Sequence, residues 1–243
     1  MLITGGSKGI GRGIAIYLGR HRARVLLTSR DSSVAETVAS ELRGEGIDAA
    51  GYGLEVSDRR SIENLADRVW REQGAISVLV NNAGTNIPEK ALEVSEESWD
   101  VVQTANLKGT FFMSQAVARR WVEDGALGAI VNISSQAGLV AIDKRAAYCS
   151  SKAGVVNLTR ELALEWAEHG IRVNSVAPTF VATPMTEPML ADPAFRDQVL
   201  SMIPLGRVAQ PEEVGAATLF LACPAAELIT GHTLVVDGGW TIH

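Results

Sequence analysis

The sequence predicts a single α/β domain built on a doubly wound, parallel β-sheet. Short apolar segments typical of buried strands alternate along the chain with longer segments of helical periodicity. A glycine-rich turn, Gly5 to Gly11, joins the first strand to the first helix. The 243 residues, 47% of them hydrophobic, suffice for one large core and are few for two domains.

Composition and charge argue against several kinds of partner. A net charge of −6 and a pI near 5.3 disfavour nucleic acid and anionic membranes. The two cysteines and four histidines have no metal-ligand spacing, so we expect no metal site. The chain enters Leu2-Ile3-Thr4-Gly5 without a basic and apolar leader, and the uncharged stretch 125–142 is broken by polar residues. We therefore expect a soluble cytoplasmic protein.

The first half of the chain reads as repeated strand and helix. Strands are expected over 1–4, 24–29, 49–56 and 76–80, with helices over 12–19, 33–43 and 58–72. Asp58 is a plausible N-cap for the third helix. The strand over 76–80 is continuously apolar, as in a parallel sheet buried on both faces.

The second half continues this pattern. We expect a long helix over 99–121 that Asn106 interrupts, a second over 147–166, and strands over 129–134, 171–177 and 233–237. Ligands of such sheets bind where the strands have their carboxyl ends. Gly5, Arg30, Asn82 and Ser135 all follow strand ends. The sequence therefore predicts that they face one crevice.

The glycine-rich turn suits a dinucleotide. Its pattern is T-G-x-x-x-G-x-G, in which glycines let the backbone approach phosphates and the following helix offers free N–H groups. The second strand ends in Ser29-Arg30, and Lys8 lies in the turn. Two cations and no acid at Ser29 favour the 2′-phosphate of NADP(H). Asp31 leaves NAD(H) open, because a shift of one residue would bring its carboxylate to the ribose.

Tyr148 and Lys152 form a candidate proton-transfer pair. They lie four residues apart, on the same face of a predicted helix. A cation near a phenol favours the phenolate and lowers the phenol's pKa from about 10. Ser135 follows a strand end, where its hydroxyl would lie beside the phenol. These residue types suit general acid–base catalysis.

Together these motifs resemble the short-chain dehydrogenase/reductase family over essentially the whole chain. The matching segments are Thr4-Gly5-x-x-x-Gly9-x-Gly11, Asn81-Asn82-Ala83-Gly84, Asn106, Ser135, Tyr148-x-x-x-Lys152 and Pro178, in the family's order and spacing. Ser135, thirteen residues before Tyr148, matches the family's catalytic serine. The resemblance implies a Rossmann fold and an oxidoreductase that uses NADP(H) or NAD(H).

The resemblance also implies a role for each matched residue. Tyr148 is the general acid/base, Lys152 lowers its pKa and holds the nicotinamide ribose, Ser135 binds the reacting oxygen, and Asn106 anchors a relay water. The implied cofactor-binding residues are Gly5, Ser7, Lys8, Gly9, Ile10, Gly11, Ser29, Arg30, Glu55, Val56, Asn82, Ala83, Gly84, Tyr148, Lys152, Pro178, Val181 and Thr183.

The chain departs from the family pattern in three places. Family members have several residues before the first strand, so we expect a short first strand here. The family's adenine-contacting Asp-Val is Glu55-Val56, whose side chain is longer. The family's Pro-Gly after the sixth strand is Pro178-Thr179, which changes the backbone freedom beside the nicotinamide.

The substrate is less clearly indicated. The segment 184–207, rich in proline and methionine, resembles the family's lid, and Met185 is a candidate wall residue. Asn86, Gln136 and Arg145 would suit a hydroxylated or acidic molecule. The C-terminal segment resembles sugar and polyol dehydrogenases and also 3-oxoacyl carrier-protein reductases. Acidic residues near the flanking helix ends disfavour an acidic carrier protein. A nucleotide-binding regulator without turnover is the third alternative.

We assign residues 1–140 mainly to cofactor binding and 141–243 to the catalytic helix, the lid and an oligomerisation segment. The helices over 99–121 and 147–166 carry apolar residues around much of their circumference: Phe111, Phe112, Met113, Val117, Trp121, Leu158, Leu162 and Trp166. The stretch 231–243 is also apolar. Burial of these surfaces by two-fold symmetry predicts a homotetramer.

Overall fold

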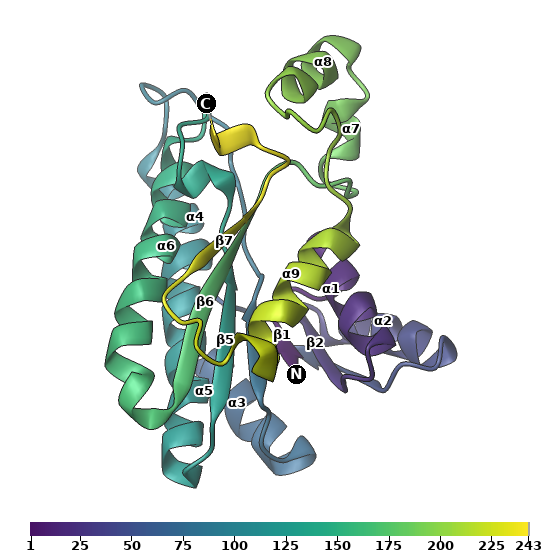
Figure 1. Cartoon of the computed structure of the whole chain (residues 1–243), viewed down its shortest axis with the longest axis vertical. Coiled ribbons are helices and arrows are strands. Elements are labelled where there is room, and N and C mark those ends of the chain that lie inside the picture. The colour runs from purple at the N-terminus through teal and green to yellow at the C-terminus, as the bar shows by residue number, and fades with distance from the viewer. Residues whose placement is uncertain (243) are drawn as a thin grey trace.

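Residues 1–242, the part of the chain that the computed structural model describes, form a seven-stranded parallel sheet between two layers of helices (Figure 1). The strand order is β3-β2-β1-β4-β5-β6-β7. The strands are β1 Leu2–Ile3, β2 Val25–Ser29, β3 Ala49–Gly53, β4 Val78–Asn81, β5 Gly128–Ile133, β6 Ile171–Pro178 and β7 Thr233–Val236. The prediction of a doubly wound α/β fold is confirmed.

The direction of winding reverses beside β1, because this strand pairs with β2 on one side and with β4 on the other. All neighbouring strands run parallel, so their carboxyl ends lie along one edge of the sheet. A crevice for a ligand forms at such a switch point.

Helices cover both faces of the sheet (Figure 1). On one face lie α1 Gly9–Arg20, α2 Ser32–Gly44 and α9 Pro211–Ala222; on the other lie α3 Arg59–Gln73, α5 Gly109–Asp124 and α6 Ala146–Trp166. Each layer has its own buried apolar cluster, which includes Leu27, Val80 and Val131 on the first face and Leu26, Leu79 and Ile130 on the second. This alternation along each strand follows from the period of two in a β-strand.

Two glycines let α1 and α9 pack closely. A Cβ atom on Gly13 would lie 2.1 Å from Cβ of Pro211, and one on Gly215 would lie 2.6 Å from Cβ of Tyr17. Real Cβ atoms do not approach so closely, so larger residues would separate the helices. This close packing against α9 fixes the position of α1, the helix that begins at the glycine-rich turn.

The predicted helix over 99–121 is part of a longer helical run. It comprises α4 Glu96–Gln103, a π-helical segment Thr104–Lys108 and α5. The expected interruption at Asn106 lies within the π-helical segment, and single π-turns are frequent at functional sites. β3 ends at Gly53, not at 56, because Glu55 and Ser57 form a turn in which the Glu55 carboxylate accepts from the Ser57 N–H at 3.0 Å.

The segment expected to be a lid contains two short helices, α7 Glu187–Leu190 and α8 Pro193–Ser201, which stand beyond the edge of the sheet (Figure 1). Phe180 stacks on Trp240 with 5.8 Å between ring centroids and meets Phe195 edge-on at 5.9 Å. These contacts attach α8 and the C-terminal turn to the end of β6.

No helix within residues 1–242 has both the length and the apolar character needed to cross a membrane. The cytoplasmic location stays a prediction. The expected short first strand is present as the two residues of β1.

Candidate active site

The crevice lies at the carboxyl edge of the sheet. The glycine-rich turn follows β1, Arg30 follows β2, Asn82 follows β4, Ser135 follows β5 and Thr179 follows β6. Helix α6 brings Tyr148 and Lys152 to the same edge, since Ser134 donates to the Lys152 carbonyl at 3.0 Å. The structure therefore unites residues from both halves of the chain.

The glycine-rich turn forms a cradle that suits a pyrophosphate. Gly5 and Gly9 have φ of +63° and +54°, in the left-handed region that glycine adopts without strain. A Cβ on Gly11 would lie 2.3 Å from the Gly5 carbonyl oxygen, so a side chain would fill the cradle. No side chain among residues 1–242 caps the N-terminus of α1, where Lys8 is the N-cap residue. The main-chain N–H groups of this helix start thus suit phosphate oxygens.

Asn82 braces this cradle from the neighbouring loop. Its carboxamide donates to the carbonyls of Thr4 and Gly5 at 3.0 and 3.1 Å. The main-chain N–H groups of Asn82 and Ala83 both donate to the Thr4 hydroxyl at 3.0 Å. The side chain of Asn82 therefore holds the protein's own backbone. Gly84 follows, and a Cβ there would lie 2.8 Å from Oδ1 of Asn106.

The end of β2 is followed by an exposed cation, Arg30, and by an acid, Asp31, whose carboxylate caps a helix. Arg30 and Lys8 are exposed, and neither has an ion pair among the described residues. Asp31 caps α2 by accepting from the N–H and hydroxyl of Ser33 at 2.8 and 2.7 Å. These hydrogen bonds lower the pKa of Asp31 and use its carboxylate as a helix cap.

Glu55 and Val56 lie past the end of β3. The Glu55 carboxylate is turned toward its own turn, where it accepts from the Ser57 N–H at 3.0 Å and the Ser57 hydroxyl at 2.7 Å. Val56 packs against the core layer that contains α5. The Glu55 carboxylate thus binds the N–H and hydroxyl of Ser57, a contact that the sequence did not predict.

Ser135 and Tyr148 form the centre of the crevice. The buried Ser135 hydroxyl donates to Oε1 of Gln136 at 2.7 Å and accepts from the Ala137 N–H at 3.1 Å. Burial raises the pKa of Tyr148, and the Ser135 hydroxyl acts in the opposite sense. The sequence predicts a lowered pKa for Tyr148, but in the protein without cofactor this pKa is raised. The phenol is held neutral, because desolvation outweighs its neighbours.

Lys152 is buried with 6% of its surface exposed. Its ammonium donates to the Ile133 carbonyl at 2.8 Å and lies 5.7 Å from the centroid of the Tyr148 ring. Desolvation lowers the pKa of Lys152 to about 8. The site thus contains a cation whose charge the fold itself destabilises.

Both side-chain N–H donors of Asn106 and its Oδ1 atom make hydrogen bonds within the protein. Its Oδ1 accepts from the Thr85 N–H at 2.7 Å, and its Nδ2 donates to the Thr85 carbonyl at 2.9 Å and the Ser151 hydroxyl at 3.0 Å. Its main-chain carbonyl accepts from Thr110 at 2.7 Å. A carbonyl oxygen has two lone pairs, so the main-chain oxygen can also accept from a water, as can Oδ1.

The expected nicotinamide side is formed by Pro178, Val181 and Thr183. The Pro178 carbonyl lies 3.5 Å from the Ser135 hydroxyl, and Val181 pairs with Ala209. The Thr183 hydroxyl is 3.0 Å from the Thr186 hydroxyl at the start of the lid. A Cβ on Gly9 would lie 3.6 Å from Thr183, so the base of the lid touches the glycine-rich turn.

The candidate substrate residues differ in their surroundings. Oδ1 of Asn86 is buried without a hydrogen-bond partner in the described chain. Gln136 is buried and accepts from Ser135. Arg145 is half-buried, desolvation lowers the pKa of its guanidinium, and it donates to the Lys144 carbonyl. Met185 is 63% exposed on the lid and does not line a closed wall.

Sequence reasoning missed the residues that position this site. The Ser151 hydroxyl accepts from the Asn106 carboxamide, and the Ser134 hydroxyl donates to the backbone of α6. The main-chain N–H and carbonyl of Thr85 pair with the oxygen and nitrogen of the same carboxamide. Ser151 follows Tyr148 by three residues, and its hydroxyl donates to the Tyr148 carbonyl at 2.7 Å. The only available signal was a serine on the buried face of the helix, beside Lys152.

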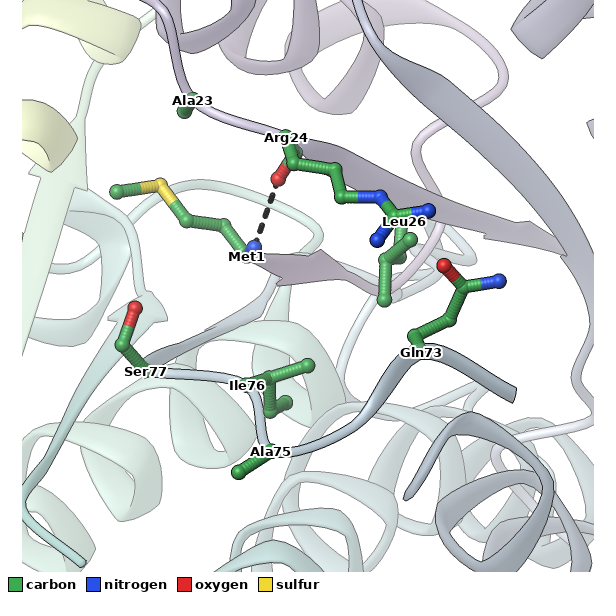
Figure 2. Close-up of a pocket in the computed structure, with 8 residues that line it drawn as sticks. All are labelled: Met1, Ala23, Arg24, Leu26, Gln73, Ala75, Ile76 and Ser77. Carbon is green, nitrogen blue, oxygen red and sulfur yellow. Dashed lines mark hydrogen bonds between the residues drawn. The ribbon is translucent and has the colours of Figure 1, made fainter. Parts of the chain in front are cut away.

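A cavity of about 260 Å³ lies at the opposite edge of the sheet (Figure 2). It is lined by Met1, Ala23, Arg24, Leu26, Gln73, Ala75, Ile76 and Ser77, and the Met1 amine donates to the Arg24 carbonyl at 2.8 Å. This cavity is at the amino ends of the strands, away from Tyr148. Within residues 1–242, no group of three or more histidine, cysteine, aspartate or glutamate residues is arranged to hold a metal.

Known proteins resemble the chain along its whole length. A family model described as enoyl-(acyl carrier protein) reductase matches residues 5–241. D-threitol dehydrogenase of Mycolicibacterium smegmatis is 43% identical, and the match covers 99% of this chain and 92% of that protein. The 3-oxoacyl-[acyl-carrier-protein] reductase FabG of Thermotoga maritima is 39% identical, with 99% and 97% covered. NAD-dependent glycerol dehydrogenase of Listeria innocua is 38% identical, with 99% and 93% covered.

The solved structures agree with these matches. The crystal structure of a gluconate 5-dehydrogenase from Burkholderia cenocepacia, in complex with NADP and tartrate, superposes with a TM-score of 0.96 at 34% identity. The match covers 100% of this chain and 94% of that one.

The buried ammonium yields a prediction about stability. Lys152→Met should raise the free energy of unfolding at pH 7 by up to about 3 kcal/mol, because the fold lowers the pKa of Lys152 from 10.5 to about 8. Below pH 8 the lysine is charged in both states, so the full cost of burying the charge applies. This cost disappears as pH rises from 8 to 10.5. Urea unfolding between pH 6.5 and 10.5 measures the difference.

Lys90→Met, at an exposed lysine, is the matched control and should leave stability within about 0.5 kcal/mol of the wild type. A Lys152→Met protein that is less stable than the wild type at pH 7 would contradict the assignment of a costly buried charge.

Proposed function

The chain belongs to the short-chain dehydrogenase/reductase family, and we propose that it interconverts a secondary alcohol and a ketone on a sugar, polyol or sugar-acid-like substrate. Members of this family are oxidoreductases that act on CH–OH and C=O groups. Nicotinamide dinucleotides are the family's cofactors, and NADP is bound in the gluconate 5-dehydrogenase neighbour. The proposal starts from one observation: Ser135, Tyr148 and Lys152 converge beside a glycine cradle without a capping side chain.

When bound, the nicotinamide accepts the hydride from the alcohol carbon or supplies it to the ketone carbon. The protein's part is proton transfer. Tyr148 takes the hydroxyl proton when the alcohol is oxidised and returns a proton to the carbonyl oxygen in reduction. The neutral phenol that burial favours is the form needed to donate. For oxidation the phenolate must form, and the buried ammonium of Lys152 lies nearby to stabilise it.

The neighbouring residues support Tyr148 in distinct ways. We assign Ser135 to bind the reacting oxygen, for which its hydroxyl turns from Gln136 to the substrate. Lys152 stabilises the phenolate and holds the nicotinamide ribose hydroxyls. Asn106 holds the π-helical segment against α6, and its main-chain carbonyl offers a site for the relay water.

NADP(H) is the cofactor we propose as preferred. Lys8 and Arg30 are exposed at the ribose end of the crevice, while Asp31, the acid that left NAD(H) open, is engaged as the cap of α2. A 2′-phosphate gains from two cations, and a 2′-hydroxyl would find no free carboxylate there. The NAD-dependent glycerol dehydrogenase relative makes NAD(H) the alternative to test.

The crevice favours a hydroxylated substrate over an acyl thioester. The buried, unpartnered Oδ1 of Asn86 is an acceptor that a sugar or polyol hydroxyl would satisfy. Arg145 suits the carboxylate of a sugar acid. The relatives include both a polyol dehydrogenase and a 3-oxoacyl reductase, so the two classes must be compared directly.

A panel of substrates tests this function. Threitol, glycerol, gluconate and a 3-oxoacyl thioester are each assayed with both cofactors by the absorbance of the reduced nicotinamide. Turnover of the hydroxylated substrates supports the proposal. Turnover of the thioester alone would replace it with the reductase alternative, and no turnover of any carbonyl or alcohol would leave a nucleotide-binding regulator.

We also propose a homotetramer, whose two-fold interfaces cover apolar surfaces of the chain. Met113, Val117, Trp121 and Leu162, expected in such an interface, are instead fully buried in the protomer core. Phe111 and Leu158 stay partly exposed. They line a groove of about 460 Å³ between the π-helical segment, α5 and α6, together with Leu107 and Gly154. A second copy of this groove would pack α5 and α6 against their counterparts.

A second apolar surface lies near the C-terminal segment. Phe220, Leu228, Val235 and Ile242 are all exposed there, Leu228 completely. Two separate apolar surfaces on opposite sides of β6 suit two different two-fold interfaces, which together generate a tetramer.

Tyr148→Phe should reduce turnover to less than a tenth of the wild type while the affinity for the cofactor stays near the wild-type value. The change removes the hydroxyl that carries the proton, a group to which we assign no essential part in binding the dinucleotide. Steady-state kinetics and cofactor fluorescence titration measure the two effects. Lys152→Ala should lower both turnover and affinity, since it has both tasks. Activity above a tenth in Tyr148→Phe would remove the phenol from the reaction.

Arg30→Asp should weaken NADP(H) binding at least tenfold relative to NAD(H), because charge-assisted contacts to an anion contribute about 1.5–3 kcal/mol each. Titration with both cofactors measures the ratio. Arg119→Asp is the control, with the same change in net charge at an exposed position on α5. If Lys8→Ala and Arg30→Ala both leave NADP(H) affinity unchanged, the proposed preference is wrong.

Light scattering should give a mass about four times the 25.9 kDa of one chain. Leu158→Arg should lower this mass, since it places a charge in the apolar groove. Leu92→Arg, at a fully exposed leucine, should not. A single-chain mass for the wild type at micromolar concentration would refute the oligomer, and a two-chain mass would leave one interface.

A further inference from the structure

Thr179 carries a hydroxyl that has no hydrogen-bond partner within the described chain. Only 8% of the residue is exposed, and its Oγ1 is fully buried. The backbone at this position is well held, because the Thr179 N–H donates to the Val236 carbonyl at 3.2 Å. A threonine hydroxyl can donate one hydrogen bond and accept two, so its burial without any of them costs free energy.

The strand pattern tells which way Thr179 faces. Successive side chains of a strand point to opposite faces. In β6, Val173 belongs to the cluster with α5 and α6, while Val176 belongs to the cluster with α1 and α9. Thr179 continues the row of Val173, and the pairing of its N–H with β7 shows that the extended backbone persists. Its side chain is therefore on the side of α6, the helix that carries Tyr148.

Thr179 is also next to the group assigned to the reacting oxygen. The Ser135 hydroxyl lies 3.5 Å from the carbonyl of Pro178, the residue before Thr179. A substrate oxygen bound between Ser135 and Tyr148 would thus lie close to the backbone that carries Thr179. Because Oγ1 is fully buried in the chain without ligand, rotation about χ1 would be needed to bring this hydroxyl to a substrate hydroxyl on the carbon adjacent to the reacting carbon.

The chemistry of the two candidate substrate classes differs at this carbon. A polyol or sugar has a hydroxyl on the carbon next to the one that reacts. A 3-oxoacyl thioester has methylene groups on both sides of its ketone, and these offer no hydrogen bond. A site with a buried polar group rejects the analogue that lacks its partner far more strongly than an apolar site does.

We propose that Thr179 is a specificity-determining residue whose hydroxyl binds the hydroxyl vicinal to the reacting carbon, so that the enzyme selects vicinal diols. This inference rests on the proposed function and specifies its substrate class. The threonine provides one neutral hydrogen-bonding group to the substrate and takes no part in proton transfer.

The experiment compares two alcohols that differ by one hydroxyl, butane-2,3-diol and butan-2-ol, with threitol as the reference polyol. Wild-type kcat/KM should be at least tenfold higher for the diol. Thr179→Val should lower kcat/KM for the diol and threitol by about tenfold and leave butan-2-ol unchanged. Thr179→Ser, which keeps the hydroxyl, should restore most of the preference.

Thermal unfolding without substrate gives a readout that is independent of activity. Thr179→Val should leave Tm unchanged or raise it, since it removes an unsatisfied hydroxyl. Thr159→Val is the control. Its hydroxyl donates to the Val155 carbonyl at 2.8 Å and accepts from Asn132 at 3.0 Å, so its loss should lower Tm. A similar drop in Thr179→Val would mean that the folded protein already uses the hydroxyl and would overturn the inference.

The kinetic outcomes separate this inference from the proposed function. Equal losses on the diol and butan-2-ol, or weakened cofactor binding in Thr179→Val, would assign Thr179 to the cofactor or the backbone and overturn the inference alone. A wild-type enzyme that reduces 3-oxoacyl thioesters and oxidises neither diol nor threitol would overturn both.

Discussion

The site depends on the buried carboxamide of Asn106. It joins the loop after β4, the π-helical segment and α6 through hydrogen bonds to Thr85 and Ser151. An amide buried in this way is costly unless all its hydrogen bonds are made, so the three segments can adopt only the arrangement that satisfies it. Helix α6 carries Tyr148 and Lys152, and Gly84 lies under the same amide. One satisfied polar group thus fixes the relative position of the proton-transfer residues and the cofactor crevice.

The same fold pays a cost at Lys152. An ammonium with one carbonyl partner and 6% exposure is destabilised relative to water, which is why its pKa falls to about 8. The scaffold tolerates this cost because Ser134 and Asn132 anchor α6 to β5 by hydrogen bonds that do not depend on the charge. Burial raises the pKa of Tyr148 as well, so the protein alone favours a neutral phenol beside a destabilised ammonium. At pH 7 Lys152 is still protonated, so Tyr148 is the group that must change its ionisation when the phenolate forms.

Much of this arrangement could be predicted from the sequence, because it follows from topology. Parallel strands end at one edge, so residues just past Ile3, Ser29, Asn81 and Ile133 had to converge. Hydrogen-bond partners could not be predicted in the same way. Asp31 and Glu55 have the chemistry of ribose and adenine ligands, yet both carboxylates accept from serines two residues ahead. The sequence also does not show whether an apolar side chain lies in the core or at the surface. Trp121 was expected in an interface, but it lies in the core and donates to the Ile76 carbonyl. Such choices depend on which competing partner lies nearer in space.

The distinction between filled and unfilled polar groups therefore separates scaffold from ligand site. Asn82 and Asn106 make their side-chain hydrogen bonds within the protein, so they hold the crevice in shape. The start of α1, the Asn86 carbonyl oxygen and the Thr179 hydroxyl lack partners among the residues described, and all three lie along one edge of the sheet. Buried polar atoms without a partner also occur elsewhere in the described chain, for example on Arg12 and Gln73, so it is the position of these three groups at the carboxyl edge that connects them with a ligand. The uncapped helix start suits the phosphates of the proposed cofactor, and the two neutral groups suit the hydroxyls of the proposed substrate.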